Sequence, residues 1–257
     1  MNVESFIGAL DRGLDFGNAD AALMRRARDH LQQALGDESF LADCLDRSLD
    51  ELSRTLSNPC VFEAPDRGID VRMVFWPPRF ENAPHMHQTW TLTGVLHNIV
   101  EIRTYHATDL TVQQLYLGRK GSAGYLLAPC MHNVRNPSHE TSVSLHVFSQ
   151  AKQLQPLAPS CETLTQVPAT DSLDYSGTRK LTLMALIDLA TQTSGVVAPH
   201  LLNKVFALGD RGVKLQAIKA MSGFDLEETS DRIRELLLIT SGEDHAHLKH
   251  IWLKLSR

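Results

Sequence analysis

The central stretch of the chain, residues 69–149, constrains the fold most, because it breaks into short segments rich in β-branched and aromatic residues. Pro, Gly and Asn separate these segments, as is typical of turns between strands. The clearest segments cover residues 69–76, 90–96, 99–105 and 141–148. Short strands at this spacing predict a sandwich or barrel of β-strands in the middle of the chain.

Helical patterns flank this central part on both sides, so the expected class is α+β. Residues 1–56 carry apolar side chains at helical spacing and predict helices that pack on a barrel formed by 57–152. A Pro-containing linker at 153–172 leads to an α-helical domain at 173–257. Its helices are expected at 178–192, 198–208, 211–222, 228–240 and 243–255. Short HEAT-like repeats and an ordinary small bundle both explain this pattern.

Composition excludes several classes of partner. The formal net charge of −5 on 257 residues offers no broad attraction to nucleic acid or to an anionic membrane. The four cysteines match no zinc spacing and no redox pair. No apolar run is long enough for a membrane helix, and the N-terminus lacks the pattern of a signal peptide. The expected location is therefore the cytoplasm.

Three histidines predict a metal site inside the β-rich part. His85 and His87 stand two residues apart, so both side chains lie on one face of a strand. His132 follows in a later segment and can complete the site from a neighbouring strand. Imidazole nitrogen binds iron, zinc, copper and nickel, so the donor set indicates a transition metal without choosing among them.

These residues resemble the two sequence motifs of the cupin superfamily. The likeness is carried by His85, His87, Gly94, Pro129, His132 and Asn136. It implies a double-stranded β-helix barrel of the jelly-roll type. Many cupins add a glutamate ligand at the position that Thr91 occupies here, so the resemblance implies a site of three histidines.

The likeness extends to the thiol dioxygenases of the cysteine dioxygenase type over roughly residues 65–150. It includes residues 132–148, Trp90, Gly94 and residues 101–105. This resemblance implies Fe(II) as cofactor, O₂ as co-substrate and a small thiol as substrate, with nickel, copper and zinc still compatible. The family's tyrosine is replaced by Phe148, which can donate neither a proton nor a hydrogen bond.

Further side chains are expected around the metal. His146 and Ser144 alternate onto one face with Phe148 and are candidates to orient substrate or relay a proton. An arginine is expected to hold a substrate carboxylate; the candidates are Arg54, Arg72 and Arg103. Trp90 lines the cavity or packs in the core, and Tyr105 replaces the lost hydroxyl if its strand faces inward.

Three functions follow as hypotheses. The first is a mononuclear non-haem iron oxygenase that adds O₂ to the sulfur of a small thiol or cysteine-derived compound. The second keeps the metal site but runs a different oxidation in a specialised pathway, on a substrate derived from an amino acid or bound to a carrier protein that the C-terminal helices recognise. The third is a non-catalytic sensor of a metal or ligand that uses those helices as a docking surface.

Overall fold

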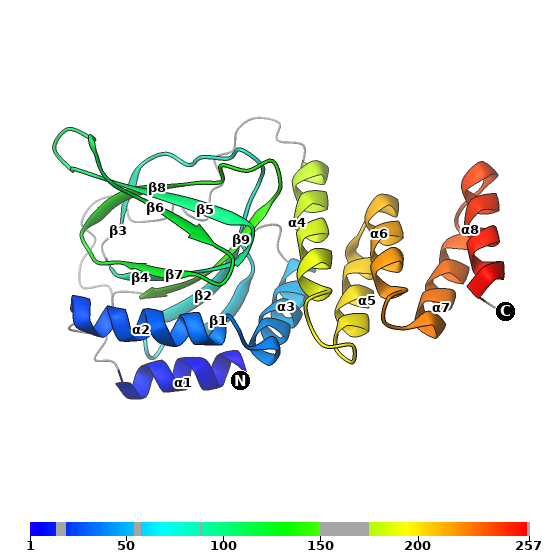
Figure 1. Cartoon of the computed structure of the whole chain (residues 1–257), viewed down its shortest axis with the longest axis horizontal. Coiled ribbons are helices and arrows are strands. Elements are labelled where there is room, and N and C mark those ends of the chain that lie inside the picture. Colours follow the sequence, from blue (N-terminus) through cyan, green and yellow to red (C-terminus); the bar gives the residue numbers. More distant parts are fainter. Residues whose placement is uncertain (14–18, 54–57, 88, 150–174, 256–257) are drawn as a thin grey trace.

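The structure is a computed structural model that describes residues 1–13, 19–53, 58–87, 89–149 and 175–255. Three helices come first: α1 (Val3–Gly13), α2 (Ala21–Ala34) and α3 (Glu38–Leu52). The β-rich part follows, and five further helices run to the C-terminal end (Figure 1). The expected linker at 153–172 lies outside the described residues, as does Arg54.

The described strands form two antiparallel sheets. The first sheet has the order β1-β2-β9-β4-β7, with β1 (Cys60–Ala64), β2 (Ile69–Trp76), β4 (Thr91–His97), β7 (Ala123–Leu126) and β9 (Ser142–Ser149). The second has the order β3-β8-β5-β6, with β3 (His85–His87), β5 (Ile99–Tyr105), β6 (Val112–Arg119) and β8 (Cys130–Arg135). A mixed α+β fold is therefore confirmed, but the strands form two sheets and not the closed barrel that was expected.

Strand alternation separates an apolar face from a polar face in the first sheet. On β9, Val143, Leu145 and Val147 are fully buried and join the main core beneath the N-terminal helices. The intervening side chains point toward the second sheet, where a smaller core lies between the layers. That small core consists of Val74, Trp76, Val95, Val100 and Val134. The molecule is thus layered as helices, first sheet and second sheet.

Helix α2 lies very close to β4 at Gly94. A Cβ atom at this position would stand 2.9 Å from Leu35 Cδ1 and 3.1 Å from Leu31 Cδ2. Asp20 starts the helix by accepting a hydrogen bond from the backbone N–H of Leu23 at 2.7 Å. Glycine is favoured at this point because a larger side chain would press on the side chains of Leu31 and Leu35.

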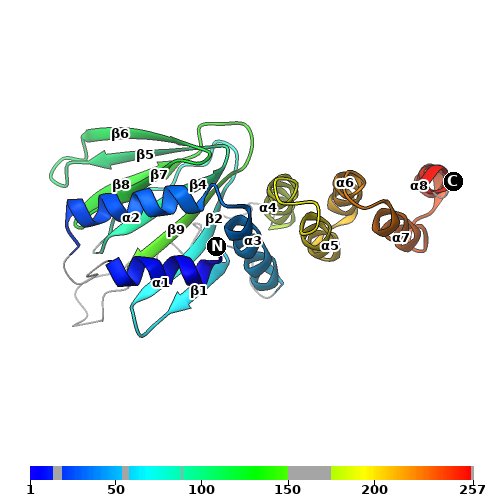
Figure 2. The same cartoon turned by 60° about the horizontal axis from the view of Figure 1, so that its bottom comes forward.

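The C-terminal helices extend from the sheets as a row of antiparallel neighbours (Figures 1 and 2). They are α4 (Tyr175–Ala190), α5 (Ala198–Leu208), α6 (Arg211–Met221), α7 (Leu226–Leu237) and α8 (Gly242–Leu255), close to the expected ranges. Buried side chains of α4 to α8 belong to the same hydrophobic core as the first sheet. Lys204 of α5 pairs with Asp46 and Asp50 of α3 at 2.5 and 2.8 Å. The row is therefore packed onto the β-rich part and shares its core.

No helix within the described ranges is both long enough and apolar enough to span a membrane.

Replacing Gly94 tests the contact between α2 and β4. Gly94→Val should lower the free energy of unfolding by about 1–3 kcal/mol, because the added methyl groups collide with Leu31 of α2 and with Leu35 directly after it. Urea denaturation measures the change. Gly124→Val is the matched control, since a Cβ at Gly124 on β7 meets no atom within 4 Å. Equal losses in both variants would contradict the packing argument.

Candidate metal centre

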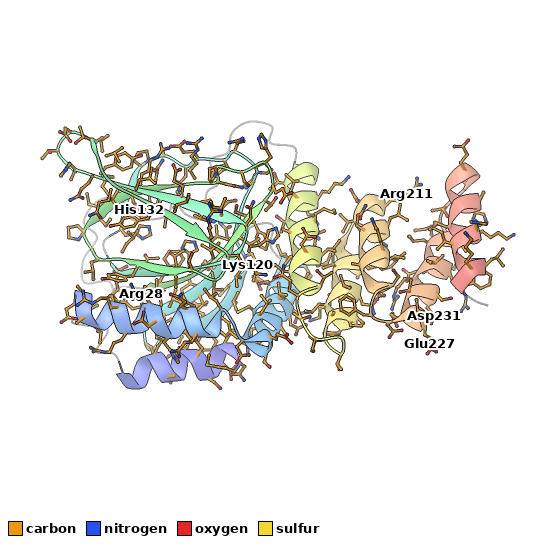
Figure 3. The ribbon with its side chains drawn as sticks, viewed as in Figure 1. Arg28, Lys120, His132, Arg211, Glu227 and Asp231 are labelled. Atoms are coloured by element: carbon orange, nitrogen blue, oxygen red, sulfur yellow. The ribbon has the colours of Figure 1, made fainter. Side chains whose placement is uncertain are left out.

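The two expected histidine segments meet on neighbouring strands of the second sheet. β3 pairs with β8 so that His85 lies opposite His132 and His87 lies opposite Cys130. One ring nitrogen of each histidine lies within 4.8 Å of the others, and the Nε2 atoms of His85 and His87 are 3.2 Å apart. His132 sits within the β-rich part of the molecule (Figure 3). The structure therefore brings the three predicted ligands together.

The opposite nitrogens of these rings already have polar neighbours. His85 Nδ1 lies 3.1 Å from the carbonyl oxygen of Ala83, and His132 Nδ1 lies 3.5 Å from that of Cys130. A carbonyl only accepts, so each Nδ1 carries the proton and each Nε2 keeps its lone pair. Metal-binding histidines commonly have their second nitrogen fixed in this way. His87 Nδ1 has a hydroxyl partner, Thr91 Oγ1, at 3.4 Å.

Burial keeps the three rings neutral. It lowers the pKa of His132 to about 3 and that of His87 to about 4, and neighbouring histidines add to both shifts. Burial also lowers the pKa of His85. Metal binding requires neutral imidazole, so the site is ready for a cation at neutral pH. Two buried rings and the half-buried ring of His85, with one nitrogen of each close to the others, form a donor set that fits a transition metal.

Phe148 forms a wall beside the cluster. Its ring is stacked on His87 with centroids 6.0 Å apart, and on His146 with centroids 5.5 Å apart. Thr91 lies opposite Phe148 in the strand register, on the same inner face. A phenyl ring and a threonine thus occupy the places where the resemblance would put a tyrosine and a glutamate.

His146 is held by a chain of hydrogen bonds between the sheets. Trp76 Nε1 donates to Ser144 Oγ at 2.7 Å, and Ser144 Oγ lies 2.8 Å from His146 Nε2. Thr93 Oγ1 lies 3.2 Å from His146 Nδ1. Because the indole only donates, the serine hydroxyl is free to donate to Nε2, and Nδ1–H then donates to the threonine. Burial lowers the pKa of His146 to about 3, so the ring is neutral.

Arg72 is the candidate arginine that faces the site. It lies directly opposite His146 in the register of β2 and β9, so the two side chains share the inner face. Its Nε atom is 2.6 Å from Asp70 Oδ2, and about a third of the side chain remains exposed. The ion pair holds the guanidinium against Asp70, which lies opposite Phe148 on the same inner face.

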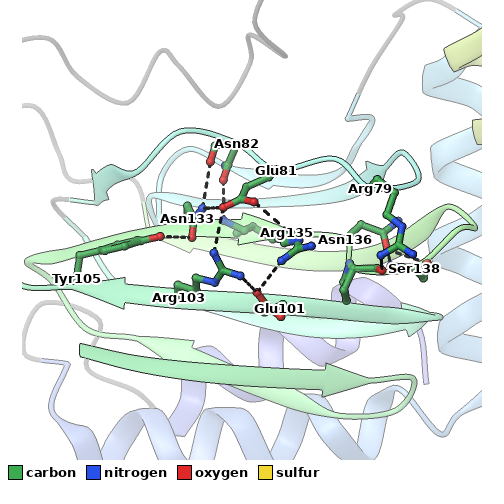
Figure 4. A network of polar contacts seen from close by, with 12 residues as sticks. Arg79, Glu81, Asn82, Glu101, Arg103, Tyr105, Asn133, Arg135, Asn136 and Ser138 are labelled. Atoms are coloured by element: carbon green, nitrogen blue, oxygen red, sulfur yellow. Dashed lines mark hydrogen bonds and ion pairs between the residues drawn. The ribbon is translucent and has the colours of Figure 1, made fainter. Parts of the chain in front are cut away.

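Three other expected site residues lie elsewhere. Arg103 and Tyr105 stand opposite Asn133 and Met131, on the outer face of the second sheet, while Thr104 between them shares the inner face with His132. Tyr105 Oη donates to Asn133 Oδ1 at 3.0 Å, outside the site (Figure 4). Trp90 belongs to the core under the helices. Their placement therefore argues against direct contact with a substrate bound at the three histidines.

Sequence reasoning missed several contributors. Two threonines contact histidines of the site: Thr91 lies against His87, and Thr93 lies against His146. The indole of Trp76 donates to Ser144, which in turn holds His146. Strand alternation offered a signal for the threonines, since both share a face of one strand. Trp76 is joined to Ser144 only through the pairing of distant strands, so no local pattern could have indicated it.

No protein-family model matches the chain, and no curated protein matches it. Solved structures align with part of it. An oxalate oxidase in complex with the substrate analogue glycolate aligns over 32% of this chain and 42% of its own, with 17% identity and a TM-score of 0.30. The TT1209 protein of Thermus thermophilus aligns over 41% of this chain and 93% of its own, with 20% identity and a TM-score of 0.33.

Oxalate decarboxylase of Bacillus subtilis, a protein with Mn(II) centres, aligns over 33% of this chain and 22% of its own, with 21% identity and a TM-score of 0.30. This chain therefore covers less than half of the oxalate oxidase and about a fifth of the decarboxylase. TM-scores of this size do not establish a shared family. The geometry of the histidine cluster itself is the basis for assigning chemistry.

The neutral His146 predicts a pH dependence of stability. Its pKa is 6.5 in the unfolded chain and about 3 when folded, so between these two pH values only the unfolded state gains the proton. Stability should therefore fall as the pH drops below 6.5. Replacing the ring should lower the slope of the free energy of unfolding against pH by about 1.4 kcal/mol per pH unit.

Urea denaturation of the metal-free protein above and below pH 6.5 measures this slope, which should be shallower in His146→Asn than in the wild type. Phe148→Leu changes the same wall without removing a titratable group, so its slope should match that of the wild type. An unchanged slope in His146→Asn would show that the ring is not held neutral.

Proposed function

We propose that this protein is a metal-dependent oxygenase that oxidises the sulfur of a small thiol at the cluster of His85, His87 and His132. The observation that carries the proposal is the convergence of three neutral imidazoles, one nitrogen from each within 4.8 Å, with no carboxylate in the cluster among the described residues. Three neutral ligands leave the charge of a divalent cation uncompensated. Such a site favours an anionic substrate atom, and a thiolate is one.

Fe(II) is the metal proposed for this site. When bound there, it would supply open positions at which a thiolate and O₂ meet. Addition of O₂ to a thiol gives a sulfinic acid: both oxygen atoms end on sulfur, the S–H bond is replaced, and the proton remains on the product. The reaction needs no external reductant, because sulfur supplies all the electrons that oxygen takes up.

The surrounding side chains would orient the substrate and restrict its protonation. Phe148 would present an apolar ring to the substrate on one side of the cluster, stacked on His87. His146, fixed by Ser144 and Thr93, keeps its Nδ1–H and presents no free lone pair to a thiol. Arg72 offers a cation on the same face for a substrate carboxylate.

One observation favours a second candidate, a different oxidation at the same metal site. Phe148 provides no hydroxyl, and both nitrogens of His146 are already engaged. A reaction that needs a proton donor beside the metal would have to take it from the substrate. The cysteine-derived substrate would then be oxidised by loss of hydrogen, with or without carbon dioxide, and O₂ would accept the two electrons and two protons as hydrogen peroxide instead of adding to sulfur.

Metal content and oxygen uptake test the proposal together. Wild-type protein should hold one iron per chain, and His132→Ala should lose both the metal and the activity because one of three ligands is gone. The thiols to supply are cysteine, 3-mercaptopropionate, mercaptosuccinate and cysteamine. His106→Ala, in the exposed connection between β5 and β6, is the matched control and should retain both.

Mass spectrometry of the product separates the candidates. A gain of two oxygen atoms supports sulfur dioxygenation, whereas loss of carbon dioxide supports the second candidate. Absence of thiol-stimulated uptake in the iron-loaded protein would sink the main proposal.

The role of Arg72 is tested by its kinetics. Arg72→Gln should raise KM for a carboxylate-bearing thiol by about 10-fold or more, because a charge-assisted hydrogen bond is lost. KM for cysteamine, which has no carboxylate, should stay nearly constant. Arg103→Gln is the control on the outer face, and rates are expressed per bound metal. A rise in KM for Arg103→Gln alone would reverse the assignment.

A further inference from the structure

The strand that carries His85 and His87 changes its register just before it reaches them. Upstream, Glu81 is bridged to Arg135, and the backbone N–H of Asn82 donates to the carbonyl of Val134 at 3.1 Å. Downstream, His85 pairs with His132. Continued without interruption, the first register would pair His85 with Met131. One additional residue is therefore accommodated between Asn82 and His85.

This shift decides which way the histidines point. Met131 pairs with Tyr105 on the outer face, whereas His132 pairs with Thr104 on the inner face. Side chains alternate along a strand, so a slip of one residue exchanges the two faces. In the upstream register, His85 and His87 would project away from His132. The extra residue acts as a bulge that turns both rings inward.

Side-chain amides hold the chain together at the shift. Asn82 Oδ1 accepts from the backbone N–H of Val134 at 2.6 Å. Asn133 Nδ2 donates to the carbonyl of Asn82 at 3.3 Å and to Glu81 Oε1 at 2.7 Å. The two amides thus make bonds that main-chain groups would make in a regular ladder. Asn133 is 2% exposed, so losing its partners would leave a buried polar group unsatisfied.

An outer ion-pair network holds these groups in place (Figure 4). Arg103 lies 3.4 Å from Glu81 and 2.6 Å from Glu101, and Arg135 approaches the same two carboxylates at 3.8 and 3.9 Å. Two arginines balance two glutamates, so the network offers no net charge to a ligand. Both arginines contact Glu81, which also accepts a hydrogen bond from Asn133 Nδ2, so the network lies against the shifted segment.

We infer that Asn133, together with Asn82, is a positioning residue for the metal centre: the two amides fix the register shift that puts His85 and His87 on the same face as His132. The inference rests on the proposed metal site for its consequence, but the register itself is a property of the polypeptide. Each asparagine acts through the backbone: Asn82 bonds to that of β8, and Asn133 bonds to that of the segment just before β3.

Cobalt(II) titration of the full-length protein provides the first test. Asn133→Asp keeps the acceptor for Tyr105 but loses both amide donors and sets a carboxylate against Glu81. Cobalt affinity should fall by about 10-fold or more, as is usual when groups that orient metal ligands are changed. The visible spectrum of bound cobalt should change as well. Tyr105→Phe, which leaves the donors of Asn133 intact, should match the wild type in both.

A disulfide reports the register without any metal. Met86 and Met131 lie directly opposite each other, so the double variant Met86→Cys, Met131→Cys should form a disulfide with oxidised glutathione as oxidant. Peptide mass spectrometry measures its yield. The yield should be high in the otherwise wild-type chain and lower once Asn133→Asp or Asn82→Ala is added. Asn82→Ala serves as the second variant should Asn133→Asp not fold.

The outcomes separate the two proposals. A wild type that binds no cobalt would overturn the proposed metal function, while the disulfide yields would still decide the register. A wild type that binds cobalt, with unchanged affinity, spectrum and disulfide yield in both asparagine variants, would overturn this inference alone. A loss of thermal stability without any of these changes would also overturn it, because it would reveal a structural role only.

Discussion

The pairing of β9 with β2 on one side and β4 on the other is the interaction on which the rest of the structure depends. It fixes the alternation of β9, so Val143, Leu145 and Val147 complete the core beneath the helices. The same register turns Ser144, His146 and Phe148 toward the second sheet. One strand therefore both anchors the helical layer and builds the wall of the histidine cluster.

Polar side chains between the sheets are tolerated because they satisfy one another. Ser144 and Thr93 take both nitrogens of His146, and backbone carbonyls face the Nδ1 atoms of His85 and His132. Burial disfavours the charged form of every one of these rings and lowers each pKa. Protonation of these histidines would destabilise the protein, so burial keeps them in the neutral form. Neutral imidazole is also the form that binds a metal. The energetic demand of burial and the chemical demand of metal binding coincide.

The sequence predicted the three ligands because strand alternation accounts for two of them and the resemblance to a second motif accounts for the third. His85 and His87 share a face by alternation, and His132 was placed by its resemblance to a second motif. Arg103 and Tyr105 were harder to place, since their face depends on whether β5 pairs with β8 at Thr104 or one residue away. Trp90 also depended on which side of β4 the helices cover. Each of these side chains could have belonged to either face until the pairing was known.

By itself, the sequence determined the mixed helix and strand composition, the approximate helix positions at both ends, and the identity of the candidate ligands. These follow from local periodicity and from residue chemistry. Only the tertiary structure decided that the strands form two sheets, that the C-terminal helices share the core of the first sheet, and that Arg72 faces inward while Arg103 faces outward. The physical reason is that a register shift of one residue, such as that between Asn82 and His85, leaves composition and period unchanged yet exchanges the two faces of a strand.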